Sequence, residues 1–379
     1  MARGAWILCF GLLGAGLSAA ALDYPGTSDV GDFMTWAHAL LARGPVAGYA
    51  AIADYPPLGP SLLWLGIGAG RLAHLPDLVS LKLEIALFQL ASAAIVARRY
   101  RSLSAGALLW VLIAPFGALL GYIDCFYLPF VLLAVFALED GRFALGGAMI
   151  AVALLIKWQP AILAPVMLLY AARRAQGWRK VSCLVPGAAI GLAVIWLFGP
   201  RAVWFAFSGA AGDPYFSGQA FNLDWIVSGF LEVFHLAGAP ALQGGTIVAI
   251  TALAPPWYGL SKILFWIVYL GVLGVFAAGK KPLALALLTA ELAQFDFNTG
   301  VHENHGFLVM ILAFVAVCGL VLEGPYLGVI ATVMLANILL FYGLNLVSGA
   351  AASAGTLLLS GLNLVVFTML AAKFLRGSA

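Results

Sequence analysis

The sequence predicts an all-α polytopic membrane protein with about 12 transmembrane helices. Of its 379 residues, 64% are hydrophobic and only 9% are charged, and the mean hydropathy is +1.04. Soluble domains contain roughly 45–50% apolar and about 25% charged residues, so these values exclude a water-soluble protein. The formal net charge of +3 is too small to indicate a nucleic-acid partner.

Twelve apolar segments are expected to cross the membrane as helices of roughly 20 residues, some of them short. They run at 4–22, 80–97, 104–120, 125–138, 144–157, 160–172, 183–198, 261–278, 283–297, 305–322, 325–343 and 354–372. The first segment also fits a cleavable signal peptide, because Arg3 precedes it and small residues end it, but its length favours a retained helix.

These spans predict one integral membrane domain over residues 1–379. In this domain 1–22 is the first span, 23–79 and 199–260 are large outer loops, 80–198 holds spans 2–7 and 261–379 holds spans 8–12. The four cysteines lie in or beside apolar runs without metal-ligand spacing, which predicts neither disulfides nor a zinc site.

The apolar segment 58–73 decides the predicted topology. If it crosses the membrane, the basic run at 98–101 falls outside. If it lies along the outer surface, 13 of the 19 Lys and Arg residues fall inside, most of them in short loops. Cytoplasmic loops are enriched in basic residues, so the sequence favours a surface helix and places both termini in the cytoplasm.

Acidic residues have the opposite distribution in this topology. Acids respond little to the insertion rule, yet 12 of the 16 fall on the outer side: Asp23, Asp29, Asp32, Asp54, Asp77, Glu84, Asp124, Asp213, Asp224, Glu232, Asp296 and Glu303. Charges near the membrane core are costly and usually face a cavity or one another. We therefore expect a polar, water-filled cavity that opens outward.

The first outer loop carries two candidate acids before an amphipathic segment. Asp29 or Asp32 can cap a helix that begins near Phe33, because a carboxylate accepts hydrogen bonds from the free N–H groups there. Capping explains one of the two acids but not both. Apolar residues on one face of 33–41 predict a helix at the membrane interface, which would hold Asp32 near the cavity.

Polar residues also interrupt three later apolar segments. Two prolines follow Asp54 and Tyr55 and fix an extended turn, although a simple transition from loop to helix explains them too. Asp124 lies between two apolar helices with little loop around it, where a solvated turn is the alternative. Lys157 and Gln159 lie at an outer helix end, and the alternative for this lysine is a side chain that snorkels to the membrane surface.

The densest polar group lies between two late spans, in the segment QFDFNTGVHENHGF. It contains Gln294, Asp296, Asn298, His302, Glu303, Asn304 and His305. An ordinary short outer loop rarely contains so many titratable groups. His302, Glu303 and His305 lack further ligands at metal-binding spacing, so a metal site is the less favoured interpretation.

Taken in order, these segments resemble the lipid-dependent glycosyltransferases of the GT-C superfamily. They are similar to the dolichyl-phosphate-glucose glucosyltransferases of N-glycan assembly and to bacterial GPI-mannosyltransferase-like proteins. The combination of DYPPL with a later VHE carries the resemblance more than any single motif. The matching residues are Gly31-Asp32-Phe33, Asp54-Tyr55-Pro56-Pro57-Leu58, Gly121 to Asp124, Lys157 with Gln159, Phe221-Asn222-Leu223 and Val301-His302-Glu303.

The resemblance implies a GT-C-like fold in which an aspartate of the first outer loop is the general base, and Asp32 is the matching position. It also implies a role beside the donor phosphate for Lys157, His302 and Glu303. The family commonly has arginine or lysine after the His-Glu pair, whereas this chain has Asn-His. The chain is also shorter than the eukaryotic enzymes, so the sugar and the acceptor do not carry over.

Inverting transfer of a hexose, glucose or mannose, from a polyprenyl-phosphate donor fits these residues chemically. One base must take the proton from the attacking hydroxyl, for which Asp32 is the first candidate and Asp29 the second. The phosphate leaving group needs no paired acid, but it does need positive charge and hydrogen-bond donors. Lys157, His302 and Gln159 can supply both.

The remaining candidates are expected to support the reacting groups. Glu303 can orient His302 or bind sugar hydroxyls, while Asp54, Tyr55 and Asp124 are expected behind these groups or on the acceptor side. The sequence lacks two facing carboxylates of glycoside hydrolysis and an Asp-x-Asp motif, so no metal or other cofactor is expected. The expected partners are the lipid-linked donor, a glycan or lipid-linked acceptor and membrane lipids.

Two other functions remain open from the sequence. A transporter or flippase for a solute or a lipid-linked sugar also needs a cavity with buried charges, but it would more naturally show inverted repeats, and none is evident. A polymerase or ligase acting on polyprenyl-diphosphate glycans would need more basic residues outside. The composition favours a bacterial inner membrane with the active site on its extracytoplasmic side.

Overall fold

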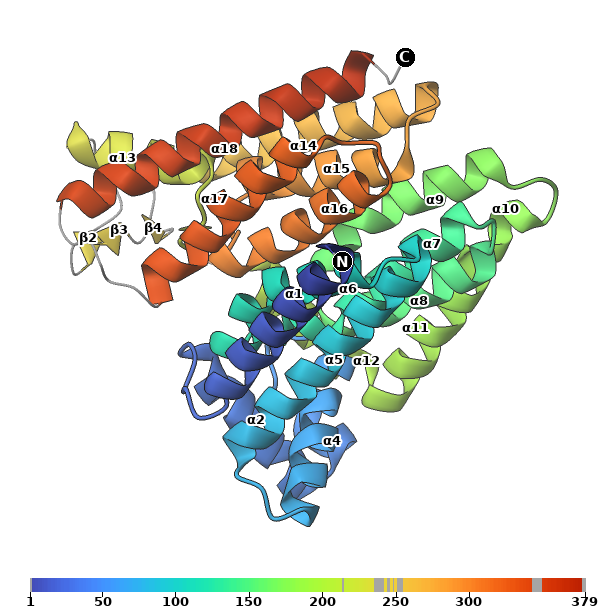
Figure 1. Cartoon of the computed structure of the whole chain (residues 1–379), viewed down its shortest axis with the longest axis vertical. Helices are drawn as coiled ribbons and strands as arrows, with labels where there is room; N and C mark the ends of the chain where they lie inside the picture. Colours follow the sequence, from blue (N-terminus) through green and yellow to red (C-terminus); the bar gives the residue numbers. More distant parts are fainter. Residues whose placement is uncertain are drawn as a thin grey trace. The chain divides into compact units, whose positions relative to one another are not determined.

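The computed structural model describes residues 2–212, 215–234, 242–243, 246–247, 249–250, 255–342 and 350–376, most of which are helical (Figure 1). Among these residues, four helices are long and apolar enough to cross a membrane: Asp77–Tyr100, Arg179–Phe198, Gly259–Ala278 and Ala354–Arg376. Shorter apolar helices of 10–17 residues accompany them. The predicted helical class is confirmed, and the length and composition of these helices support an integral membrane protein, while the number of 12 spans stays a prediction.

The chain divides into two compact units. The first contains Met1–Ala164 and Tyr170–Gly212, and the second contains Pro165–Leu169 and Asp213–Ala379. Every one of the twelve apolar segments expected from the sequence contains a helix. Asp213 and much of the expected outer loop 199–260 lie outside the described residues.

The first unit begins with a helix and then the elements of the first predicted outer loop. In chain order its helices are α1 (Ala2–Ala20), α2 (Asp29–Arg43), α3 (Pro45–Tyr49), α4 (Leu58–Leu72), α5 (Asp77–Tyr100), α6 (Leu103–Ala114), α7 (Leu128–Glu139), α8 (Phe143–Ile156), α10 (Arg179–Ser182), α11 (Leu184–Phe198) and α12 (Pro200–Ala211) (Figure 1). A π-helix, η1 (Pro115–Leu119), and two 3₁₀-helices, η2 (Ile123–Phe126) and η3 (Gln159–Ile162), complete it. Helix α9 (Leu163–Arg174) contributes residues to both units.

The second unit contains the remaining helices and four very short strands. Its helices are α13 (Leu223–Val233), α14 (Pro255–Ala278), α15 (Leu283–Phe297), η4 (Glu303–His305), α16 (Gly306–Cys318), α17 (Gly324–Tyr342) and α18 (Ala350–Arg376). Strand β1 (Tyr215–Ser217) pairs antiparallel with β4 (Ala249–Ile250), and β2 (Leu242–Gln243) pairs with β3 (Thr246–Ile247).

Helix α15 and helix α16 form the interior of the second unit. Every residue of 283–296 and of 306–316 is buried. A helix that is hydrophobic around its whole circumference is typical of such a buried position. The polar side chains that α15 carries, Thr289, Glu291, Gln294 and Asp296, are therefore buried as well.

Helix α2 begins at Asp29, which is earlier than the start near Phe33 expected from the sequence. Ser28 precedes the helix without a side-chain capping hydrogen bond, and Asp29 and Asp32 both lie in the first turn. The expected start near Phe33 is therefore wrong, while the capping role considered for one of these aspartates stays a prediction. Both residues lie in the first turn of the helix, where the aligned peptide dipoles favour negative charge.

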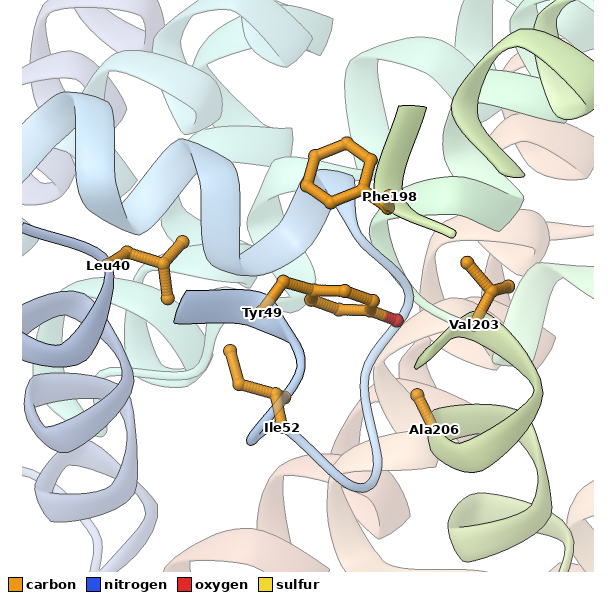
Figure 2. Close-up of a cluster of buried hydrophobic side chains, with 6 residues drawn as sticks. All are labelled: Leu40, Tyr49, Ile52, Phe198, Val203 and Ala206. Atoms are coloured by element: carbon orange, nitrogen blue, oxygen red, sulfur yellow. The ribbon is translucent and has the colours of Figure 1, made fainter. Parts of the chain in front are cut away.

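A cluster of buried side chains fixes residues 40–52 against two helices of the first unit, α11 and α12. It contains Leu40, Tyr49, Ile52, Phe198, Val203 and Ala206 (Figure 2). Figure 2 shows the ring of Tyr49, the last residue of α3, beside the ring of Phe198 at the end of α11, and the two ring centroids lie 5.3 Å apart. Burial of apolar surface at roughly 25 cal/mol per Å² stabilises this attachment.

Two breaks between the apolar helices of the first unit lie inside the protein. The first follows η1, where residues 120–129 are all buried. The second follows α8, where Lys157, Gln159 and Pro160 are buried. Irregular backbone at membrane depth is tolerated only where protein covers it or water lines it. Each of these breaks carries polar residues that the sequence singles out.

Candidate functional site

The two candidate acids of α2 differ in exposure. Asp32 is exposed to solvent and Asp29 is half-buried, while Phe33, which follows Asp32, is completely buried. The Phe33 and Trp36 ring centroids lie 5.5 Å apart. The aromatic face of α2 thus packs against the rest of the unit and keeps the Asp32 carboxylate outside.

The segment at residues 53–57 packs against this aromatic face. The Tyr55 ring centroid lies 5.0 Å from that of Trp36 and 6.1 Å from that of Phe33. The Tyr49 hydroxyl donates a hydrogen bond of 2.9 Å to the Tyr55 carbonyl oxygen. Burial raises the pKa of Tyr49, so its hydroxyl remains protonated and keeps donating this bond.

Asp54 is exposed and lies beside helix α12 of the same unit. A Cβ atom added at Gly209 would lie 2.8 Å from the Asp54 Oδ1 atom and would also meet the Ala53 carbonyl oxygen. A glycine is therefore needed at this position for α12 to approach the segment so closely.

Lys157 and Asp124 form an ion pair across the two helix breaks. The Lys157 Nζ atom donates to Asp124 Oδ1 at 2.7 Å, and the side chains are 9% and 0% exposed. The Tyr127 hydroxyl lies 3.3 Å from Gln159 Oε1 and 3.5 Å from Asp124 Oδ1. The Lys157 Nζ atom also lies 5.8 Å from the Tyr55 ring centroid. The snorkelling alternative for Lys157 and the solvated turn for Asp124 are therefore wrong.

A buried lysine that the sequence analysis did not single out supports this arrangement. Lys82 of α5 is 1% exposed, and its Nζ atom donates to the carbonyl oxygens of Ala118 and Leu119 at 2.8 Å each. The next carbonyl, that of Leu120, accepts a 2.9 Å bond from the Thr27 amide. The signal in the sequence is a charge inside an apolar helix, which is expensive unless it is bonded.

Gly26 packs against the backbone of Leu120, in the turn that follows η1. Its φ of +80° is a left-handed conformation, and an added Cβ would meet the Leu120 carbonyl oxygen. Glycine permits both the conformation and the contact. The chain before α2 is thereby fastened to the turn that leads to Asp124.

The histidine and glutamate candidates lie in the second unit, next to β1. The Gly218 amide donates to the Val301 carbonyl oxygen at 2.7 Å, and the Glu303 amide donates to the Gly218 carbonyl oxygen at 3.1 Å. The His302 ring is half-buried and lies 5.3 Å from the Tyr215 ring centroid. Glu303 is buried. Backbone pairing therefore sets the direction of both side chains.

Two asparagines of the last helices hold the segment between β1 and α13. Asn337 of α17 accepts a 2.8 Å bond from the Phe221 amide and donates a 2.7 Å bond to the Gln219 carbonyl oxygen. Asn363 of α18 donates to the Phe221 carbonyl oxygen at 3.2 Å and to Asp296. Neither asparagine is among the residues predicted from the sequence, although a lone amide in an apolar helix is a recognisable signal.

Asp224 lies in the first turn of helix α13 and has a buried carboxylate. The Ser261 hydroxyl donates to its Oδ1 atom at 2.5 Å. Burial raises the pKa of Asp224 well above its usual range, and the bond from Ser261 opposes this shift only in part. Burial thus disfavours the charged form of this carboxyl group.

The structure brings seven of the predicted site residues into the first unit and two into the second. The first group is Asp29, Asp32, Asp54, Tyr55, Asp124, Lys157 and Gln159, and the second is His302 and Glu303. Within the described ranges, no group of three or more His, Cys, Asp and Glu side chains is arranged to hold a metal ion. Asp124, Lys157 and Gln159 form a buried polar cluster. The water-filled cavity that the sequence predicts around them stays a prediction.

Comparison with known protein families found no family model that matches the chain, and a search of curated proteins found no match.

Proposed function

We propose that this protein is an inverting glycosyltransferase of the GT-C type. It moves a hexose from a polyprenyl-phosphate sugar to a lipid-linked or cell-envelope glycan on the extracytoplasmic side of a bacterial inner membrane. The observation that carries the proposal lies in the first unit. There Asp32, an exposed acid, directly precedes Phe33, whose ring centroid lies 6.1 Å from that of Tyr55, and the buried ammonium of Lys157 lies 5.8 Å from the same Tyr55 ring centroid.

Asp32 is the proposed general base. Its carboxylate is exposed at the start of α2, so an acceptor hydroxyl can reach it without rearrangement of the core. A positioned base that takes a proton in the transition state typically contributes about 10²–10⁴ in rate. Asp29, in the same turn, is the second candidate.

Lys157 is the proposed anchor of the donor phosphate. An ammonium group carries three N–H donors, of which the bond to Asp124 Oδ1 uses one. The ion pair with Asp124 compensates the positive charge of the lysine within an apolar unit and fixes the direction of its side chain. Positive charge held in advance stabilises the negative charge that develops on a departing phosphate.

Gln159 adds a hydrogen-bond donor to the proposal. It is bonded to Tyr127, which also contacts Asp124. His302 and Glu303 belong to the second unit, and their role beside the donor phosphate rests on the resemblance alone.

The decisive experiment replaces the proposed base. Purified protein in lipid nanodiscs is incubated with a panel of polyprenyl-phosphate hexoses and a membrane lipid extract as acceptor, and donor consumption is followed by mass spectrometry. We expect Asp32→Asn to lower turnover by at least ~100-fold with little change in donor binding. The matched control is Asp23→Asn, another exposed aspartate of the same loop, which should retain wild-type turnover.

Near wild-type turnover in Asp32→Asn would exclude this residue as the base. If no donor in the panel is consumed by the wild-type protein, but a solute or lipid-linked sugar crosses vesicles that contain it, the transporter function replaces the proposed one.

A further inference from the structure

The aromatic contacts around Tyr55 form a surface that the proposed acid and phosphate chemistry does not use. Trp36 and Tyr55 are both half-buried, their ring centroids lie 5.0 Å apart, and the planes are inclined by 54°. By contrast, Phe33 and Ala37, their neighbours on the core face of α2, are 1% and 0% exposed. Both residues pack against the buried cluster of Figure 2 on one side and keep part of their surface exposed.

An exposed aspartate lies close in the chain to each of these two aromatic residues. Asp32 precedes Trp36 by four residues on α2, and residues at this spacing are neighbours on a helix surface. Asp54 directly precedes Tyr55, and both acids are exposed. The Lys157 Nζ atom lies 5.8 Å from the Tyr55 ring centroid, so the proposed phosphate anchor adjoins the same rings.

This combination is chemically suited to a hexopyranose. One face of such a ring presents several C–H groups, which carry partial positive charge, and its rim carries hydroxyl groups. An aromatic face carries partial negative charge and therefore attracts the C–H face. Carboxylates beside the ring accept hydrogen bonds from the hydroxyl groups and fix the orientation of the sugar.

We propose that Trp36 and Tyr55 form an aromatic platform on which the pyranose ring of a substrate stacks, with Asp32 and Asp54 bonded to its hydroxyls. The platform deepens the proposed function and rests on it for the reaction, because a ring stacked on Trp36 presents its hydroxyls to Asp32 one helical turn away. The same ring chemistry is present in the donor sugar and in the glycan acceptor, and the experiment separates these two sources.

Binding of simple sugars tests the platform without requiring transfer. The full-length protein in nanodiscs is mixed with methyl α-D-mannopyranoside or methyl β-D-glucopyranoside, and saturation-transfer NMR measures binding to each. Trp36→Leu keeps an apolar side chain but removes the π face, and we expect about tenfold weaker binding. Trp36→Phe keeps an aromatic face and should remain within roughly threefold of wild type.

Trp196→Leu is the matched control, because Trp196 of α11 is 84% exposed and lies outside the platform. It should bind both glycosides as the wild type does. Tyr55→Leu repeats the test if Trp36→Leu fails to fold, which its thermal unfolding curve will show. Equal binding of both glycosides by wild type and by a folded variant that lacks either ring overturns the platform.

Turnover of the same variants then separates this inference from the proposed function. A raised apparent KM for the polyprenyl-phosphate donor in Trp36→Leu assigns the platform to the donor sugar, and a raised KM for the acceptor assigns it to the acceptor. Sugar binding that depends on Trp36 without any donor consumption supports the platform and overturns the transferase. Wild-type kcat and KM values in Trp36→Leu overturn the platform while leaving the transferase standing.

Discussion

Single residues in the first unit show how scarce charges are used in an apolar protein. Lys157 and Asp124 are 33 positions apart in sequence and form a buried ion pair. Taking one ion out of water costs several kcal/mol, which a well-placed partner and further hydrogen bonds offset. Removing a single partner leaves the other charge uncompensated, so the pair should behave as a unit.

We expect Lys157→Met to lower the free energy of unfolding by about 3–5 kcal/mol. The double variant Lys157→Met with Asp124→Leu should recover most of this loss, because neither charge then remains alone. Unfolding of the purified protein by increasing denaturing detergent measures both. Lys180→Met removes an exposed lysine and should change stability by less than about 0.5 kcal/mol. If the double variant is no more stable to unfolding than Lys157→Met alone, the two charges do not act as a coupled pair.

At the scale of elements, the position of α2 depends on a distant helix. Lys82 of α5 holds the carbonyl oxygens at the end of η1, and the following turn accepts the Thr27 amide just before α2. Gly26 allows the close approach of the two backbones. The start of α2, with both candidate acids, is thus fixed by α5 and η1 as well as by its own apolar face.

Replacing Lys82 by methionine should release this attachment. The carbonyl oxygens of Ala118 and Leu119 would lose their buried donor, which costs roughly 1–3 kcal/mol for each such group. We expect faster amide hydrogen exchange at Thr27 in Lys82→Met, measured by mass spectrometry of the peptide that contains it. Lys82→Arg retains donors and should restore part of the protection. Unchanged exchange at Thr27 in Lys82→Met would show that the turn holds without the lysine.

At the scale of the whole molecule, the topology depends on helix α4. Its 15 residues span about 22 Å at 1.5 Å per residue, which is shorter than the roughly 30 Å hydrocarbon core. The sequence favours a helix along the outer surface, and this assignment fixes the side of every later loop. One labelling experiment can therefore test the whole arrangement.

In a background in which the four cysteines are replaced by alanine, we introduce single cysteines at Leu75 and Arg142. If α4 lies on the outer surface, a membrane-impermeant maleimide added to intact cells should label Leu75→Cys but not Arg142→Cys. The reverse pattern would show that α4 crosses the membrane. The two termini would then lie on opposite sides of the membrane from each other. Permeabilised cells, in which both positions should react, provide the control.

The sequence was a good guide to what depends on local composition. Apolar runs predict helices wherever they occur, because a buried or lipid-facing backbone must satisfy its hydrogen bonds internally, and each of the twelve runs contains a helix. The same reasoning singled out Asp124, Lys157 and Gln159 as unusual polar residues. It misjudged the first residue of α2, because several polar residues before Phe33 can precede or begin a helix equally well.

Only the tertiary structure decided which polar residues are partners. Lys157 bonds to Asp124 rather than reaching the membrane surface, Lys82 holds a turn 36 positions away, and Asn363 reaches back to Phe221 across 142 positions. Composition and periodicity identify a polar group that is costly in an apolar segment. They do not identify its partner, because the packing of the helices determines the partner. That packing depends on contacts between residues distant in the chain.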